Sequence, residues 1–166
     1  MHMKKTMFII VVFAVFLISV SAHTSKVIDP SEGYIAPFFS VERNDTSVSL
    51  DQLKGKYVLL TFWASKDANS RIKCREYTSF AQDLKLEDRF CQLSINFDKS
   101  QRLFSEIVKL DKLDAETQFY AQGDRALHLI KEYQLEEGYH SFLIDQQGKI
   151  IEKDPTITSL KKILNH

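Results

Sequence analysis

The spacing of apolar and polar positions predicts a strand followed by a helix near the middle of the chain. Tyr57 to Phe62 (YVLLTF) is a short, apolar run between Gly55 and a polar turn, which is typical of a strand buried on both faces. From Ala68 onward, apolar residues recur at spacings of three and four, which predicts an amphipathic helix. Its inward stripe consists of Cys74, Tyr77, Ala81 and Leu84.

Further elements follow in alternation. Apolar and polar residues alternate over 91–97 (CQLSINF), which is the period of a strand. The remaining expected elements are helices over 101–110, 124–133 and 156–164, a short strand over 117–120, and a hairpin of strands 141–145 and 150–152. Asp124 is the expected cap of the second of these helices, and Asp154-Pro155 precedes the last one.

This order of elements predicts the fold class. Strands that alternate with helices form a parallel sheet with helices on both faces, and a terminal hairpin adds antiparallel strands at one side. We therefore expect an α/β protein, a three-layer α/β/α sandwich whose central mixed sheet is completed by a C-terminal β-hairpin and helix.

The N-terminus predicts export. Lys4 and Lys5 precede an apolar stretch from Met7 to Ile18, and Val20-Ser21-Ala22 supplies the small residues of a cleavage site. The apolar stretch has about 12 residues, whereas a membrane-spanning helix needs roughly 20. We expect a signal peptide over 1–22 rather than an anchor, a flexible leader over 23–32, and one domain over 33–166 in a periplasmic or other extracytoplasmic location, with no stable membrane span after cleavage.

Charge narrows the class of partner. Without residues 1–22 the chain keeps 20 of its 22 basic residues and all 22 acidic ones, a net charge near −2. Nucleic-acid binding needs a concentrated positive field, so a nucleic-acid partner is not expected. No cofactor is indicated by any motif. A peptide, a partner protein or a small ligand remains open.

Four short stretches keep a recognisable order and spacing. They are Ala36-Pro37-Phe38-Phe39, the run from Leu50 to Leu60 (LDQLKGKYVLL), Phe62-Trp63-Ala64-Ser65, and Phe142-Leu143-Ile144-Asp145 followed by Gly148-Lys149-Ile150. Together they resemble the extracytoplasmic thioredoxin-like proteins of the TlpA and ResA type, within the redoxin or AhpC/TSA-like superfamily. The resemblance covers roughly 33–165 and implies a thioredoxin-like fold.

The departures from this resemblance bear on the chemistry. Family members usually carry Trp-Cys-x-x-Cys after Phe-Trp-Ala-Ser, and here Lys66 follows, with Asp67 and Ser70 in the places of the two cysteines. Neither side chain supplies a nucleophilic thiolate or resolves a mixed disulfide. The place of the family's cis-proline falls at Tyr139, followed by His140, and Thr61 replaces a proton-relaying residue. The resemblance therefore implies a degenerate member.

Asp67 has two interpretations. It is either the N-cap of the following helix, accepting a backbone N–H from Asn69 or Ser70, or a general acid or metal ligand; we favour the cap. Asp67, Ser70 and His140 also resemble a hydrolytic triad, although spacing shows neither an oriented base nor an oxyanion hole. A metal site on Asp67 and His140 lacks an evident third ligand, so no metal is expected.

The same region predicts a surface patch. Its expected members are Trp63, Lys66, Asp67, Tyr139 and His140, which we interpret as a peptide-binding groove that has lost its reactivity. The first functional hypothesis is therefore a binding or accessory module without dithiol catalysis.

The two cysteines carry the alternative hypothesis. Two cysteines in an exported chain suggest a disulfide, but Cys74 lies on the helix and Cys91 opens a strand at the opposite end, too far apart for a bond. Cys74 falls on the inward stripe, so burial is expected. The alternative is a divergent thiol-disulfide oxidoreductase in cell-envelope redox homeostasis that works through Cys74 alone.

Overall fold

The computed structural model describes residues 29–43, 46–84 and 88–164. The signal peptide expected over 1–22 and most of the expected leader lie outside these ranges. Within the described residues, no helix has the length and apolar character needed to cross a membrane.

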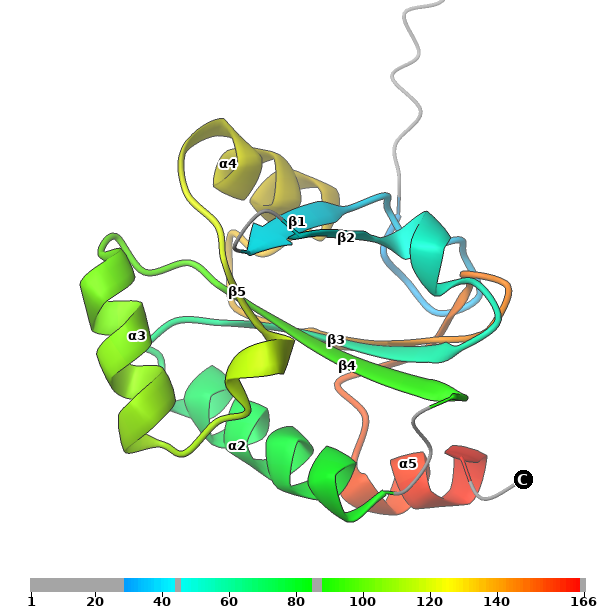
Figure 1. The fold of residues 1–166 in the computed structure, drawn as a ribbon. Coiled ribbons are helices and arrows are strands. Elements are labelled where there is room, and N and C mark those ends of the chain that lie inside the picture. Colours follow the sequence, from blue (N-terminus) through cyan, green and yellow to red (C-terminus); the bar gives the residue numbers. More distant parts are fainter. Residues whose placement is uncertain (1–28, 44–45, 85–87, 165–166) are drawn as a thin grey trace, which may run out of the picture.

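A five-stranded mixed sheet forms the centre of the molecule (Figure 1). In sheet order the strands are β5 (Gln118–Tyr120), β4 (Phe90–Asn96), β3 (Tyr57–Trp63), β6 (Ser141–Ile144) and β7 (Ile150–Lys153). Strands β3, β4 and β5 are mutually parallel, whereas β6 and β7 pair in antiparallel fashion. This arrangement confirms the α/β class, the mixed sheet and the C-terminal hairpin.

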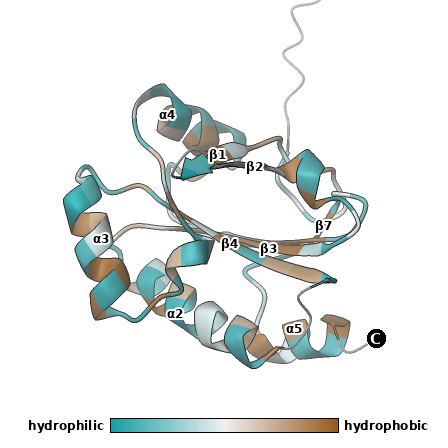
Figure 2. Cartoon of the chain, in the orientation of Figure 1, coloured by the Kyte–Doolittle hydropathy of each residue, from teal (hydrophilic) through white to brown (hydrophobic). Residues whose placement is uncertain are grey.

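Helices cover both faces of the sheet. One face carries α2 (Ala68–Asp83), α3 (Gln101–Leu110) and α5 (Ile157–Leu164), and the other carries α4 (Gly123–Glu132) (Figure 1). Val108 of α3 and Leu129 of α4 are buried, whereas Leu103, Leu110 and Leu127 on the same helices are exposed. Hydrophobic and hydrophilic residues alternate along these helices (Figure 2). The expected three-layer sandwich is therefore confirmed.

A small second sheet accompanies α4, and the sequence pattern does not predict it. It consists of β1 (Ser40–Arg43) and β2 (Thr46–Ser49), followed by the 3-10 helix η1 (Leu50–Leu53). Val41 pairs with Val48, and these are the apolar residues that the hairpin contributes to the core. Two polar four-residue strands with one apolar residue each give too little periodicity to reveal a hairpin.

Strand β3 is buried on both faces, as its apolar sequence predicts. Val58, Leu60 and Phe62 pack toward α4 and the β1–β2 hairpin, whereas Leu59 packs toward α2 and α5. The two cores also contain tyrosines whose hydroxyls are satisfied: Tyr133 donates to the Pro37 carbonyl and Tyr77 to the Pro155 carbonyl. Such bonds remove the cost of burying a phenol.

The polar residues of β4 are buried rather than exposed. Gln92, Ser94 and Asn96 all face α2, and the Gln92 side-chain amide donates to Thr78 of α2. The expected strand is confirmed with its bounds shifted by one residue. Its alternation separates an apolar face from a buried polar face.

The expected cap of the helix after β5 is wrong. Helix α4 begins at Gly123 after Gln122, which makes no side-chain cap, so Asp124 lies in the first turn and is not the cap. There its carboxylate still interacts favourably with the helix dipole.

The last residues of the expected leader, 29–32, lie against the C-terminal hairpin of β6 and β7. Pro30 is buried, the Glu32 carboxylate accepts the Lys153 N–H, and Gly33 donates to the Ile150 carbonyl. Ile35 then forms an antiparallel bridge with Lys149. Residues 32–35 therefore run along β7 and the turn before it.

One ion pair joins α2 to the end of α3. The Arg71 guanidinium donates to both carboxylate oxygens of Asp111, at 2.7 Å for the Nη2–Oδ1 bond, and the Asp111 side chain is only 5 % exposed. Its bonds to Arg71 hold the Asp111 pKa below its ordinary value of 3.8. A group with a lowered folded pKa stabilises the protein above its unfolded pKa, and that contribution is lost as pH falls through the folded pKa.

Asp111→Asn should therefore lower the free energy of unfolding at pH 7 by about 1.5–3 kcal/mol, the range for hydrogen bonds to charged groups. The difference from wild type should shrink below about pH 4, where the carboxylate of the unfolded wild type protonates. Urea melts between pH 7 and 3 measure this. Glu106→Gln removes the exposed Arg102–Glu106 pair of α3 and serves as the control, which should change little. A difference that is constant with pH would contradict the role of the ion pair.

Candidate functional site

The candidate site lies where β3 and β4 end and α2 begins. A turn from Ala64 to Lys66 connects β3 to α2. Asp98, just beyond β4, anchors this turn: its carboxylate accepts the Ser65 N–H at 2.8 Å and the Ser65 hydroxyl. Asn96 in turn accepts the Asp98 N–H at 2.9 Å. The turn is therefore fixed by side chains of the neighbouring strand.

Asp67 caps α2, which confirms the favoured interpretation. Its Oδ1 accepts the Ser70 N–H at 2.7 Å, and its backbone is extended, as in an N-cap residue. The Ser70 hydroxyl is turned inward: it donates to the Asp67 carbonyl and accepts the Ala64 N–H at 3.4 Å. Both places that would hold cysteines in the family are thus filled by groups that stabilise the helix start.

Trp63 does not belong to the surface patch expected from the sequence. Its side chain is fully buried and packs against Phe104 of α3, with ring centroids 6.1 Å apart, and against Cys74 and Val108. The expectation of a surface role is wrong because of strand parity. Successive residues of a strand point to opposite faces of the sheet. Trp63 points to the face that α2 and α3 cover, whereas Phe62 points to the other face and contacts Phe97.

A column of stacked aromatic rings leads from the core to this edge. Phe62 stacks on Phe97 with centroids 5.7 Å apart, and Phe97 stacks on Tyr139 at 5.8 Å with ring planes 9° apart. Partial burial and the nearby carboxylates of Asp67 and Asp98 raise the Tyr139 pKa. The Asp67 carboxylate is therefore close enough to act on Tyr139 electrostatically. Phe97 was missed, although its place at the end of the alternating strand pattern is a usable signal.

His140 is directed elsewhere. Its Nδ1 lies 2.6 Å from a carboxylate oxygen of Asp154, whose other oxygen accepts the Ser141 N–H. The His140 carbonyl accepts the Phe62 N–H, which fixes this loop to β3. Since Ser70 bonds to backbone and His140 to Asp154, the structure does not assemble the triad of Asp67, Ser70 and His140. In the described ranges, no group of three His, Cys, Asp or Glu side chains is placed to hold a metal.

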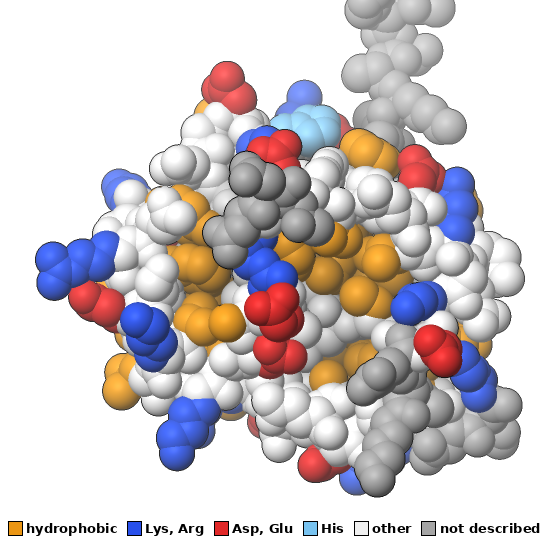
Figure 3. All heavy atoms as spheres, in the orientation of Figure 1, with side chains coloured by type: hydrophobic (Ala, Val, Ile, Leu, Met, Phe, Trp, Pro, Cys, Tyr) orange, Lys and Arg blue, Asp and Glu red, His pale blue; other side chains and the backbone are white. Residues whose placement is uncertain are grey.

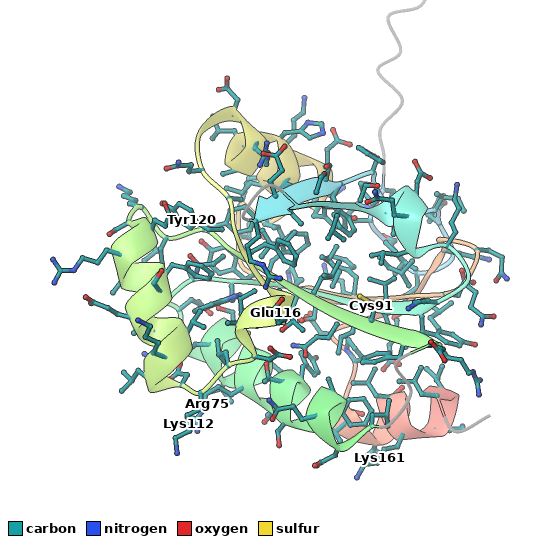
Figure 4. All side chains as sticks on the ribbon, in the orientation of Figure 1. Arg75, Cys91, Lys112, Glu116, Tyr120 and Lys161 are labelled. Carbon is teal, nitrogen blue, oxygen red and sulfur yellow. The ribbon has the colours of Figure 1, made fainter. Side chains whose placement is uncertain are left out.

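The two cysteines are free thiols on opposite faces of the sheet. Cys74 is fully buried, and its Sγ lies 3.6 Å from Oε1 of Gln118, a position suited to donation. Burial raises the pKa of the Cys74 thiol to about 12. Cys91 packs on the other face, toward the β1–β2 hairpin (Figure 4), and burial raises its pKa as well. The absence of a disulfide between these cysteines agrees with the prediction.

Comparison with known proteins assigns this fold to a family. Residues 33–153 match the model of the AhpC/TSA family. The chain therefore belongs to the AhpC/TSA family, and its fold is thioredoxin-like. A search of the curated proteins finds no match.

Solved structures agree with this assignment. A thioredoxin-like protein from Parabacteroides distasonis ATCC 8503 is 35% identical, with a TM-score of 0.70, over 82% of this chain and 96% of that one. A thiol:disulfide interchange protein from a Bacteroides species is 25% identical, with a TM-score of 0.71, over 82% of this chain and 91% of that one. The thioredoxin domain of a Bacteroides vulgatus thiol-disulfide oxidoreductase is also 25% identical, with a TM-score of 0.69, over 81% and 96%.

The cap generates a prediction. Asp67→Ala should lower the free energy of unfolding by roughly 0.5–2 kcal/mol, because the Ser70 N–H loses its acceptor at the helix start. Asp67→Asn and Asp67→Ser keep a capping oxygen and should cost much less. Denaturant melts of the three variants measure this. An Asp67→Ala protein more stable than wild type would mean that Asp67 is held under strain, as functional groups are.

Proposed function

We propose that this chain is an exported, degenerate member of the TlpA and ResA type that lacks dithiol catalysis and binds a peptide or protein partner. The binding edge is formed by Lys66, Asp67, Tyr139 and His140. Export rests on the N-terminal pattern of lysines, apolar run and small residues. Trp63 does not reach this edge and belongs instead to the core beneath α2 and α3.

The observation that carries the loss of catalysis is the environment of the sulfur atoms. The edge holds a capping carboxylate and a buried hydroxyl where thiols would react. The nearest thiol in sequence, Cys74, is fully buried and its pKa is about 12. Burial thus keeps this thiol protonated near neutral pH, and only the thiolate attacks disulfides.

The exposed chemistry of the edge supports a binding role. Tyr139 is half-buried and stacked on Phe97, which leaves a rigid aromatic surface with a polar tip. Tyrosines of this kind are enriched in protein interfaces because they provide area at a low entropic cost. Lys66 is exposed beside Asp67, and His140 adds a group paired with Asp154. A partner would thus contact the Tyr139 ring, a positive charge at Lys66 and a negative charge at Asp67.

A second candidate function is thiol-disulfide exchange through Cys74. Similar structures named as thiol-disulfide oxidoreductase or interchange proteins favour it. In this chain the reaction would require Cys74 to become accessible beneath α2 and to lose its contact with Gln118.

The first test of the proposal is catalytic. The protein without residues 1–22 should reduce insulin with dithiothreitol no faster than the uncatalysed background, because Cys74 is buried and burial raises the pKa of both thiols. A maleimide reagent should modify Cys74 slowly until the protein is unfolded. Turnover in wild type that disappears in Cys74→Ser, but persists in Cys91→Ser, would establish the second candidate instead.

The second test concerns the edge. Purified wild type immobilised on beads should retain specific proteins from the envelope of the native organism, and Tyr139→Ala and Lys66→Glu should retain several-fold less. Tyr34→Ala and Lys112→Glu are matched controls, since Tyr34 is 58% exposed near the hairpin turn and Lys112 follows α3. Equal loss in variants and controls, or no loss in any variant, would reject the edge as the binding surface.

A further inference from the structure

A groove separate from this edge lies between α3 and β5. It has a volume of about 630 Å³, within the range of small-molecule sites, and β1 and α4 complete its walls. In Figure 3 a strip of apolar side chains lies between α3, on the left, and the charged residues near the centre of the view. The groove contains none of the edge residues Lys66, Asp67, Tyr139 and His140.

One wall of the groove is a flat aromatic surface. Phe104 of α3 stacks on Tyr120 of β5, with centroids 5.6 Å apart and planes 22° apart. Tyr120 lies between α3 and α4 (Figure 4), and Val108 continues the apolar wall along α3. Both rings are partly exposed, so a planar ligand can extend the stack.

The charged side chains of the groove favour an anion. Three cations, Arg43, Lys109 and Arg125, line it against one acid, Glu42. Arg43 is engaged with Glu116 and the Ala115 carbonyl. Arg125 pairs with Glu42 at 3.1 Å with side chains 42% and 59% exposed, and exposed pairs of this kind contribute little. The Arg125 guanidinium can therefore exchange Glu42 for the carboxylate of a ligand, which accepts two parallel hydrogen bonds.

Unmet hydrogen-bond donors lie directly behind the aromatic wall. Tyr120 pairs with Asn96, and Asn96 pairs with Trp63, so the three residues form one rung across parallel strands and share a face of the sheet. The Trp63 indole N–H and the Asn96 amide nitrogen are buried without a partner. Neither residue lines the groove, so these donors lie behind its wall and do not select the ligand.

From these observations we infer that the groove between α3 and β5 binds a small aromatic carboxylate. Its ring extends the stacked pair of Phe104 and Tyr120, and its carboxylate lies at Arg125. The inference does not rest on the proposed partner-binding edge, which uses other residues.

The single tryptophan gives the test a specific reporter. Because Trp63 contacts Phe104, the indole N–H resonance of ¹⁵N-labelled protein should shift saturably when 1-naphthylacetate is added. 1-Naphthylacetamide keeps the ring without the charge and should bind at least about tenfold more weakly, a loss of roughly 1.4 kcal/mol. Cyclohexylacetate keeps the charge without the flat ring and should also bind more weakly.

Arg125→Gln should weaken 1-naphthylacetate about tenfold, and Phe104→Leu should weaken it similarly. Arg102→Gln is the matched control, because Arg102 lies on α3 outside the groove, and it should change the affinity less than twofold. The far-ultraviolet circular dichroism of each variant verifies its fold. Equal binding of acid and amide, an equal effect of Arg102→Gln, or no saturable shift up to about 10 mM ligand would overturn the inference.

Discussion

The burial of β3 on both faces is the constraint on which the rest of the structure depends. A strand with no solvent-exposed face must lie inside its sheet and be covered by two layers. Alternate residues of β3 then enter two different cores, Phe62 toward α4 and Trp63 toward α3. The edge and the groove arise from this split, since Phe62 begins the aromatic column that reaches Tyr139 while Trp63 supports the wall formed by Phe104 and Tyr120.

The start of α2 is stabilised by the side chains of Asp67 and Ser70. A helix N-terminus leaves backbone N–H groups without intrahelical partners, and it attracts negative charge. That environment stabilises a thiolate, and it also stabilises the carboxylate of Asp67, which accepts the Ser70 N–H. The inward hydroxyl of Ser70 bonds to the backbone on both sides of the turn. Both side chains are thus engaged in hydrogen bonds to the backbone at the helix start.

The buried polar layer between the sheet and α2 distinguishes this interior from a purely apolar one. Several hydrogen bonds are made within this layer. The Gln92 amide donates to Thr78 and Ser94, and the Cys74 thiol lies within donating distance of Gln118. The layer lowers the penalty of burying each polar group but fixes the positions of its members, because a lost partner leaves an unmet donor or acceptor. The unmet donors at Trp63 and Asn96 lie where this layer meets the aromatic wall of the groove.

The sequence by itself determined the order of elements, the mixed sheet and the cap at Asp67, because these depend on local periodicity and on contacts three residues apart. It also determined that no Cys-x-x-Cys pair exists. The β1–β2 hairpin was beyond it, since each strand carries one apolar residue. Only the tertiary structure decided which face of the sheet each residue of β3 points to. It therefore decided that Trp63 is buried beneath helices and that Phe97 stacks on Tyr139. It likewise decided that His140 pairs with Asp154, 14 residues away, because long-range side-chain partners depend on how the hairpin and loop pack together.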